Sequence, residues 1–557
     1  MIERLHLKFG SSPGQPPLEI QVTPITVFVG PNNSGKSKIL TEIQQFCASG
    51  QRNAQNVLID GITFGGCDQA TAEQRISKVT LKAAPHELVH PGHIIVGKRG
   101  SRNQLALANL IAALKEPTGG HVPRFCEWYL RYNTLLLDGQ NRIAMVDQRG
   151  AGDLQQPPTM AIQMLFHDDV KRAEVRRIVH DAFGSYLVVD PTNVGHLRLR
   201  LSSRAPTDSI EERGLHQAAV DFHAQALPIE QHSDGVKAFT GMIMEIVAGD
   251  PSIIQIDEPE AFLHPALSTR LGKEVASAAA TAGKRVFAST HSPNFVMGCI
   301  QSGAPINIIR LTYRAGVATA RALRKDDVLQ LMRNPLLRST GVLNALFYEF
   351  VIVTESDTDR AFYQEINERL VRENDVRAIP NCLFLNAQNK QTVQTIIKPL
   401  RSLGIPVAGI VDVDIIKEGG QVWTSFLDSG YMPNLEHQPL GAIRHSVKQK
   451  LEVTGRDMKN DGGIDLLQGE DREAASNLLE RLAEYGLFVV PHGEVESWLT
   501  QLDAPGHGSN WLIDIFQRMG EDPACADYLK PAPGDVWGFL GKIRTWMTNQ
   551  QRKGVPA

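Results

Sequence analysis

The chain has 557 residues, too many for one ordinary domain, and its 42% hydrophobic and 21% charged residues are typical of folded globular proteins. A formal net charge of −4 excludes a globally basic nucleic-acid binder, so a phosphate backbone would have to meet a local patch or metal ions. The six cysteines form no CxxC pair, which favours a reducing, cytoplasmic compartment. No apolar run reaches the length of a membrane span, so we expect no membrane partner.

The first informative pattern is a glycine-rich loop between a strand and a helix. An apolar strand at residues 25–29 leads into Gly30-Pro-Asn-Asn33-Ser-Gly35-Lys36-Ser37, and a helix follows from residue 38. This order predicts a P-loop, whose backbone N–H groups face the phosphates of ATP at the start of the helix. We expect ATP to contact Gly30, Asn33, Gly35, Lys36 and Ser37. Lys36 would neutralise the β- and γ-phosphates, and the Ser37 hydroxyl would ligate Mg²⁺.

Residues from about 50 to 225 are harder to interpret. The segment 134–146 is typical of a β-hairpin that turns at Asp138-Gly139. Residues 170–183 predict an amphipathic helix whose polar side carries basic residues, namely Lys171, Arg172, Arg176 and Arg177.

A second set of motifs completes the expected nucleotide site. An apolar strand at residues 253–256 ends in Asp257 and Glu258, and the strand that follows it in the chain ends before His291. We expect Asp257 to hold the Mg²⁺ ion through water and Glu258 to polarise the attacking water. His291 resembles the switch histidine of ABC-type ATPases, which senses the γ-phosphate. Ser233-Asp-Gly235, a small-residue turn before a helix, resembles their signature loop.

The second half of the chain predicts a smaller α/β unit. Strands near residues 350–354, 383–385 and 407–411 alternate with helices at 359–371 and 390–403. Acids follow the strands or begin a helix, namely Glu355, Asp359, Asp412, Asp414 and Glu496. Carboxylates gathered at strand ends repel one another unless a divalent cation lies between them, and oxygen ligands favour Mg²⁺ or Mn²⁺. Two such ions would stabilise the attacking and leaving oxygens of phosphodiester hydrolysis.

These motifs resemble those of the OLD (overcoming lysogenisation defect) family. The run from Asp257 to Pro265, followed by Thr290-His-Ser-Pro293, is similar to the ATPase domain of that family, and Glu355 with Asp412-Val-Asp414 is similar to its TOPRIM domain. The family includes the nuclease subunit of Gabija anti-phage systems and retron-associated effectors. The resemblance implies that two ATPase heads sandwich ATP, with Ser233 and Gly235 facing the P-loop of the other copy, so we expect a homodimer or a higher homo-oligomer.

The resemblance also implies roles for the acids and for a lysine. Glu355, Asp412 and Asp414 match the TOPRIM acids, and Asp359 and Glu496 match the acids that OLD nucleases add. These nucleases use a C-terminal lysine as well, for which Lys542 is the candidate and Lys530 the rival. We therefore expect catalytic roles for Glu258, His291, Glu355, Asp412, Asp414 and Lys542. The expected metal ligands are Ser37, Asp257, Glu355, Asp359, Asp412, Asp414 and Glu496. Ser356 stands where TOPRIM sequences usually have glycine.

The expected fold class is α/β, with an ABC-type ATPase domain at 1–340 that contains an insertion at about 50–225. A TOPRIM nuclease domain at 346–500 and a helical tail at 501–557 would follow. We interpret the chain as an ATP-regulated, divalent-metal-dependent DNA endonuclease in anti-phage defence, with a helicase-like or reverse-transcriptase partner possible. Two alternatives stay open: cleavage of RNA such as tRNA, and a DNA-repair scaffold whose TOPRIM domain only binds. The sequence leaves open whether ATP is hydrolysed or acts as an inhibitor.

Overall fold

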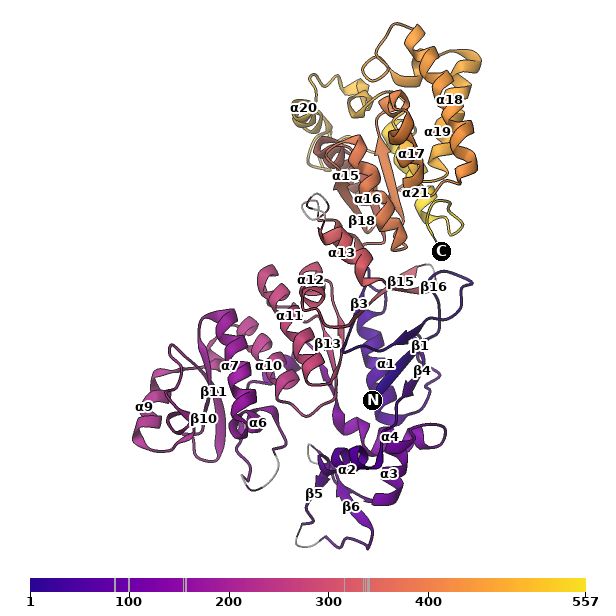
Figure 1. The fold of residues 1–557 in the computed structure, drawn as a ribbon. Coiled ribbons are helices and arrows are strands. Elements are labelled where there is room, and N and C mark those ends of the chain that lie inside the picture. The colour runs from indigo at the N-terminus through magenta and orange to yellow at the C-terminus, as the bar shows by residue number, and fades with distance from the viewer. Residues whose placement is uncertain are drawn as a thin grey trace. The chain divides into compact units, whose positions relative to one another are not determined.

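The structure is a computed structural model that describes residues 1–556 except 85–86, 99–100, 154, 156–157, 315, 334, 336 and 338–340. The chain forms two compact units, Met1–Lys325 and Asp326–Ala557, each of which is described by itself (Figure 1). The predicted boundary between residues 340 and 346 falls partly outside the described residues. Among the described helices, none has both the length and the apolar surface that crossing a membrane would need.

The first unit is built on a six-stranded sheet with the order β16-β15-β3-β14-β13-β8. The strands are β3 (Ile25–Val29), β8 (Thr134–Leu137), β13 (Ile253–Asp257), β14 (Arg285–Ser289), β15 (Ile306–Arg314) and β16 (Val317–Leu323). All neighbours are parallel except β16, which pairs antiparallel with β15. Helices α1 (Lys36–Ser49) and α11 (Pro265–Thr281) cover the two faces of the sheet (Figure 1). This double cover explains why β3 and β13 are nearly continuous apolar runs.

The predicted hairpin at residues 134–146 is wrong. Strand β8 pairs in parallel with β13, and the chain then turns into the short helix α5 (Asn141–Ala144). The turn is made by Asp138, whose Oδ1 atom accepts hydrogen bonds from the N–H groups of Gln140 and Asn141. Asp138, which precedes a glycine, therefore forms an Asx turn that leads into a helix rather than the turn of a hairpin. Strand β8 instead pairs with β13 at the edge of the parallel sheet.

The other elements of the first unit extend this α/β core. An antiparallel sheet contains β1 (Ile2–Leu7), β2 (Glu19–Gln21) and β4 (Ile59–Phe64). Further along the chain come α2 (Gln69–Ser77), β5 (Thr80–Leu81), β6 (His93–Val96), β7 (Asn103–Ala106), α3 (Leu107–Lys115) and α4 (His121–Trp128). The segment after β8 includes α6 (Ala161–His167), α7 (Asp169–Phe183), β10 (Tyr186–Asp190), β11 (His196–Ser202), α8 (Ser209–Arg213) and α9 (Gln217–Gln225).

Helix α7 confirms the amphipathic helix that was predicted at residues 170–183, but two of its basic residues do not lie on an open polar side. Arg172 and Arg176 both form ion pairs with the buried Glu212, at 3.0 and 2.5 Å. A buried carboxylate needs paired partners, so these arginines hold α7 to α8.

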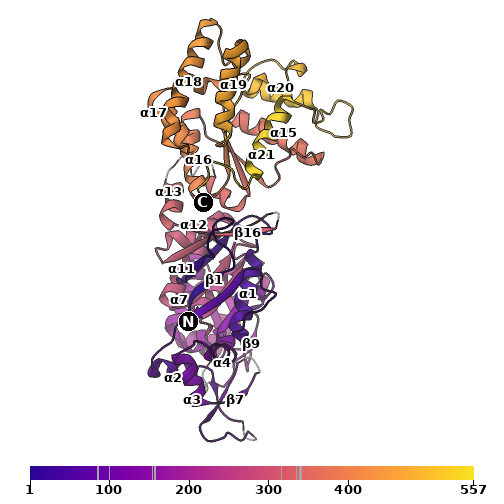
Figure 2. The ribbon, with the colours of Figure 1, turned by 90° about the vertical axis from the view of Figure 1, so that its right-hand side faces the viewer.

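The second unit has a four-stranded parallel sheet with the order β18-β17-β19-β20. Its strands are β17 (Phe350–Thr354), β18 (Cys382–Asn386), β19 (Val407–Val411) and β20 (Leu487–Val489). Helices α15 (Asp357–Arg372) and α16 (Lys390–Ser402) connect the first three strands, as the sequence predicted. Between β19 and β20 the chain forms α17 (Gly420–Ser429), α18 (Asn434–Val453) and α19 (Gly469–Ala483), and α18 and α19 lie side by side (Figure 2).

The C-terminal helices belong to the core of this second unit. Helices α20 (Ser509–Met519) and α21 (Asp535–Thr548) contribute the fully buried Trp511 and Trp537 to the cluster that contains Phe362 of α15 and Phe488 of β20. Burial of large aromatic side chains is among the strongest sources of packing energy. The C-terminal segment therefore stabilises the sheet that carries the acids.

Candidate nucleotide site and candidate metal centre

The P-loop adopts the tight curl that its glycines predict. Gly30 has φ +145°, and a Cβ atom there would lie 2.1 Å from the carbonyl oxygen of Leu311, so only glycine fits. Lys36 is only 5% exposed, and its Nζ atom donates to the carbonyls of Gly30 and Pro31 at 2.8 and 2.7 Å. Burial lowers the pKa of Lys36 to about 8, against the opposing charges of Glu258 and Asp257. The loop thus wraps a lysine at the start of α1.

The structure brings Ser37 and Asp257 together across 220 residues of sequence. The Ser37 hydroxyl donates to Asp257 Oδ1 at 3.0 Å, and the Ser289 hydroxyl at the end of β14 bonds to the same oxygen. This meeting follows from the parallel register of β3, β14 and β13, because the carboxyl ends of parallel strands lie at one edge of the sheet. A hydroxyl beside a carboxylate is the oxygen pair that a P-loop offers to Mg²⁺.

Glu258 and His291 also face one another at this edge. The Glu258 side chain is 53% exposed, and His291 Nε2 lies 3.8 Å from its Oε1. Burial, together with the charge of Lys36, lowers the pKa of His291, which favours the neutral imidazole. Glu260 joins the two strand ends: its carboxylate accepts from the Thr290 hydroxyl at 2.8 Å and from the His291 N–H at 2.7 Å.

Arg142 is a residue of this site that the sequence reasoning missed. Its side chain is 1% exposed, and Nη1 donates to the carbonyl oxygens of Asp257 and Glu258 at 2.8 and 2.7 Å. Glu258 has φ 50°, a left-handed conformation that is costly for a residue with a side chain. Arg142 thus fixes a strained backbone at the end of β13. The sequence did not indicate this role, because Arg142 is a single arginine in the segment 134–146 that was predicted to form a hairpin.

The signature-like segment lies at the start of α10 (Asp234–Val247). A Cβ atom on Gly235 would lie 2.6 Å from the carbonyl oxygen of Phe262, so glycine lets α10 approach the loop after β13. Ser233 is exposed, and its side chain does not cap the helix. Within the described part of the chain, no hydrogen bond links Ser233 to the P-loop of the same copy.

In the second unit, three acids meet at the carboxyl ends of β17 and β19. Ligand oxygens of Glu355, Asp412 and Asp414 all lie within 4.8 Å of one another. Glu355 Oε1 accepts a hydrogen bond from the Asp412 N–H at 2.9 Å. Burial raises the pKa of both Glu355 and Asp412, and the charge of Asp412 raises that of Glu355 further. The structure therefore brings together the three acids that match the TOPRIM motif.

Asp359 lies beside this group but has a local role as well. Its carboxylate accepts from the Ser356 N–H at 2.9 Å, and the Ser356 hydroxyl accepts from the Asp359 N–H at 3.1 Å. This reciprocal pair is a capping box that starts α15. Ser356 therefore replaces the usual glycine with a residue that fixes the helix start. Burial raises the pKa of Asp359, and the charge of Glu496 adds to the effect.

Glu496 belongs to a second group that the sequence predicted only in part. Ligand atoms of Glu494, Glu496 and His507 lie within 4.8 Å of one another. His507 Nδ1 is 2.9 Å from Glu496 Oε1 and 3.5 Å from Glu494 Oε1. Glu494 stands two residues before Glu496 in the same acidic segment after the strand β20. His507 comes from a loop without a motif.

Two lysines lie among these acids, and neither is the predicted one. Lys459 Nζ is 2.7 Å from Asp412 and 3.5 Å from Glu494, and Lys390 Nζ is 2.9 Å from Asp414. Lys542 is exposed on α21 and Lys530 is exposed in the segment before it. Among the described residues, neither Lys542 nor Lys530 forms an ion pair with the acids. The proposed role of Lys542 stays a prediction.

The donor set fits a divalent cation. Carboxylate oxygens are the ligands that Mg²⁺ and Mn²⁺ prefer. In addition, Asp414 Oδ1 is buried and, within the described structure, has no hydrogen-bond partner. A buried, unpaired carboxylate oxygen is costly unless a cation or water meets it.

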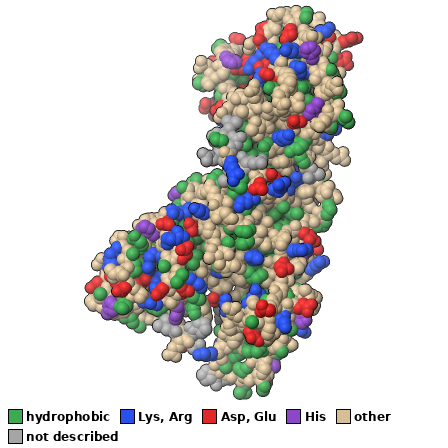
Figure 3. Space-filling view, viewed as in Figure 1, with side chains coloured by type: hydrophobic (Ala, Val, Ile, Leu, Met, Phe, Trp, Pro, Cys, Tyr) green, Lys and Arg blue, Asp and Glu red, His purple; other side chains and the backbone are tan. Residues whose placement is uncertain are grey.

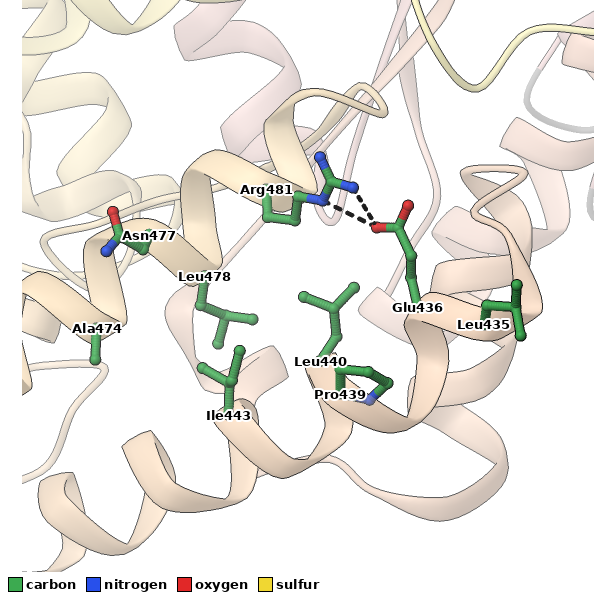
Figure 4. Close-up of a pocket in the computed structure, with 9 residues that line it drawn as sticks. All are labelled: Leu435, Glu436, Pro439, Leu440, Ile443, Ala474, Asn477, Leu478 and Arg481. Carbon is green, nitrogen blue, oxygen red and sulfur yellow. Dashed lines mark hydrogen bonds and ion pairs between the residues drawn. The ribbon is translucent and has the colours of Figure 1, made fainter.

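A further surface feature of the second unit is an apolar groove. An open apolar groove lies between α18 and α19, lined by Leu440, Ile443 and Leu478 and crossed at its rim by the Glu436–Arg481 ion pair at 2.8 Å (Figure 4). The acids of the two groups do not line it. On the face shown in Figure 3, basic and acidic side chains are interspersed.

Two family models match parts of the chain that contain residues of these two sites. The family model described as "AAA domain, putative AbiEii toxin, Type IV TA system" matches residues 196–297, which include the signature-like segment, β13 and His291. The model described as "Overcoming lysogenization defect protein-like, TOPRIM domain" matches residues 346–414, which include the three acids. A search of curated proteins gave no match.

Solved structures with a similar arrangement are heads of SMC proteins. The SMC head bound to the C-winged helix domain of ScpA is 16% identical, over 58% of this chain and 98% of that chain, with a TM-score of 0.32. The SMC head domain from Thermotoga maritima is 13% identical, over 58% and 99%, with a TM-score of 0.29. The Smc head from Pyrococcus furiosus bound to the C-terminal domain of ScpA is 14% identical, over 59% and 98%, with a TM-score of 0.28.

The fold and the two sites define an α/β protein in which an ABC-type ATPase domain is followed by a TOPRIM domain. This organisation matches that of the OLD-family ATPase–TOPRIM nucleases, as the sequence motifs predicted.

Proposed function

We propose that this chain is an ATP-regulated endonuclease that cuts DNA with the help of divalent metal ions. The observation that carries the proposal is the meeting of Glu355, Asp412 and Asp414 at one edge of a parallel sheet. Buried carboxylates that repel one another weaken a fold, and a protein that only bound nucleic acid would have no need of them. A divalent cation bound between these carboxylates would offset their repulsion.

ATP would be held by the P-loop of the first unit. Lys36 would leave the carbonyls of Gly30 and Pro31 to meet the phosphates, and Ser37 with Asp257 would hold the accompanying Mg²⁺ ion. Glu258, half-exposed and beside His291, would orient an attacking water and accept its proton. Ser233 is exposed at the start of α10, which suits an action on the nucleotide of a second copy. We therefore propose a homodimer or a higher homo-oligomer.

In the second unit, Glu355, Asp412 and Asp414 would hold one Mg²⁺ or Mn²⁺ ion, with Asp359 and Glu496 close by. A bound divalent ion would supply charge stabilisation for phosphodiester hydrolysis. Lys459 lies between the acid groups and would offer a positive charge to a phosphate once metal ions replace it as the partner of Asp412. We propose Lys459, beside the predicted Lys542, as a candidate for the catalytic lysine.

The proposed setting is cytoplasmic anti-phage defence, in which ATP binding regulates access of DNA to the metal centre. The family resemblance supports it, and a helicase-like or reverse-transcriptase partner fits the same setting. RNA is the alternative substrate, because the metal-dependent chemistry of phosphodiester hydrolysis is common to both nucleic acids.

Cleavage of supercoiled plasmid and of total RNA with Mg²⁺ or Mn²⁺, with and without ATP, tests the proposal. The wild-type chain should nick the plasmid, and Glu355→Ala should abolish nicking. Asp357→Asn is the matched control, because this exposed acid lies two residues away and pairs with Arg360 rather than with the acid group. Cleavage of RNA alone would move the substrate to RNA, and equal nicking by wild type and Glu355→Ala would remove the nuclease assignment.

A further inference from the structure

The turn after β13 carries a third acid, Glu260, two residues beyond Glu258. Its carboxylate reaches the end of the neighbouring strand β14. There one oxygen accepts from the Thr290 hydroxyl at 2.8 Å and the other accepts from the His291 N–H at 2.7 Å. Thr290 is fully buried, and its hydroxyl in turn accepts from the Ser292 N–H at 2.9 Å. A single side chain therefore ties the turn that carries Glu258 to the segment that carries His291.

The charge of Glu260 is balanced by groups of the same site. Burial raises the pKa of Glu260, and the hydrogen bonds from the His291 N–H and the Thr290 hydroxyl oppose this shift. Burial likewise lowers the pKa of Arg142, and the charge of Glu260 is the largest of the charges that oppose that shift. Arg142 donates to the carbonyl oxygen of Glu258 at 2.7 Å. Two side chains of opposite charge thus support the end of β13, as buried charges require.

The position of His291 relative to Glu258 depends on this tie. His291 Nε2 lies 3.8 Å from Glu258 Oε1. The Glu258 N–H donates to the Ser289 carbonyl at 2.9 Å, which joins the two strand ends two residues before the histidine. The Ala261 N–H donates to the Glu258 carbonyl at 2.9 Å and closes the turn that places Glu260. The carboxylate of Glu260 then fixes the backbone of His291 itself.

We propose that Glu260 is a positioning residue for ATP hydrolysis, which acts through His291. By accepting the His291 N–H, it keeps the imidazole beside Glu258 and directed to the place of the γ-phosphate. Placement of this kind matters because a displacement of about 1 Å can lower a rate by about 100-fold. This inference rests on the proposed hydrolysis of ATP at the P-loop.

Steady-state ATP hydrolysis by the full chain tests the inference with two variants of Glu260. Glu260→Ala removes both acceptors and should lower kcat about 10-fold or more, the order that a hydrogen bond to a charged group contributes. The KM for ATP should change little, because Lys36 and Ser37 keep their contacts. Glu260→Gln keeps an oxygen for the His291 N–H and offers an amide that can donate to the Thr290 hydroxyl, so it should restore most of the rate.

Glu211→Ala is the matched control. Glu211 in α8 also accepts from a threonine hydroxyl and a backbone N–H, both of Thr207, at 3.0 and 2.7 Å. It belongs to neither of the segments that carry Glu258 and His291. Glu211→Ala should therefore keep the wild-type kcat, and thermal melting shows how much stability each variant loses.

Two further measurements separate positioning from a general loss of structure. Because Glu260 acts through His291, the double variant Glu260→Ala/His291→Ala should have the same kcat as His291→Ala alone. Vanadate with ADP mimics the transition state, so Glu260→Ala should trap it poorly, yet should bind the β,γ-imido analogue of ATP as wild type does.

Equal kcat in wild type and Glu260→Ala would overturn the inference, as would a KM that rises in proportion to the loss of rate. Additive losses in the double variant, or wild-type trapping of vanadate by Glu260→Ala, would overturn it as well. A wild-type chain that binds ATP without hydrolysing it would instead count against the proposed hydrolysis, because no variant of Glu260 enters that result, and would remove the inference with it.

Discussion

Replacing Arg142 tests how the ATPase domain positions its catalytic glutamate. The guanidinium is buried and donates to the carbonyls of Asp257 and Glu258, and it forms no ion pair with a carboxylate in the described part of the chain. In Arg142→Ala both carbonyls lose this donor. The left-handed backbone of Glu258, with φ 50°, then loses one of the contacts that hold it, while the Glu258 N–H still donates to the Ser289 carbonyl at 2.9 Å.

The size of the effect follows from these contacts. A left-handed non-glycine residue costs on the order of 1–3 kcal/mol, and a hydrogen bond to a charged group contributes about 1.5–3 kcal/mol. If about 2 kcal/mol of this energy positions the Glu258 carboxylate, the rate of ATP hydrolysis should fall about 30-fold, since 1.36 kcal/mol is a factor of ten. The KM for ATP should change little, because Lys36 and Ser37 keep their contacts.

Steady-state ATP hydrolysis, with thermal melting to follow folding, measures this prediction. Arg149→Ala is the matched control, because Arg149 also donates to a carbonyl of the same segment, that of Ala144, at 2.7 Å, but does not contact β13. It should leave kcat within a few-fold of wild type. A wild-type kcat in Arg142→Ala, or a loss of affinity for ATP in proportion to the loss of rate, would contradict this role of Arg142.

The remaining predictions concern binding, pH and packing. Lys36→Ala should weaken the binding of a fluorescent ATP analogue by roughly tenfold or more, since a charged hydrogen bond contributes about 1.5–3 kcal/mol, and unchanged affinity would contradict the site. Burial raises the pKa of Glu355 above its usual 4.5, so the folded protein without metal holds a proton that the unfolded chain releases. The melting temperature of the metal-free protein should therefore fall as pH rises from 4.5, and Mg²⁺ should reverse this trend. A melting temperature that does not change with pH would contradict the acid cluster. Gly235→Ala places a Cβ atom 2.6 Å from the Phe262 carbonyl and should destabilise the first unit by about 1–3 kcal/mol in a melting assay, whereas Gly120→Ala, which meets nothing within 4 Å, should not.

Both α/β units could be predicted from the sequence because their strands are buried on both faces. Continuous apolar runs such as 253–256 and 350–354 are distinctive, and the strands β13 and β17 confirm them. The convergence of Glu355 and Asp412 was predictable for the same reason, because side chains at the carboxyl ends of neighbouring parallel strands lie at one edge.

Residues outside the strand ends could not be found in this way. Arg142, Lys459 and His507 reach their sites from a turn or from loops, and their positions depend on tertiary packing rather than on local pattern. The hairpin expected at residues 134–146 failed because a short apolar segment followed by Asp138-Gly139 fits both a hairpin and a strand before an Asx turn. Only the partner strand β13 decides between them.

The central claim, that acids distant in sequence bind divalent cations in one place, is tested most directly by crystallography with Mn²⁺. An anomalous difference map at the manganese absorption edge should show a peak between Glu355, Asp412 and Asp414, within coordination distance of all three carboxylates. A well-ordered map without a peak there, from crystals grown with Mn²⁺, would contradict the account.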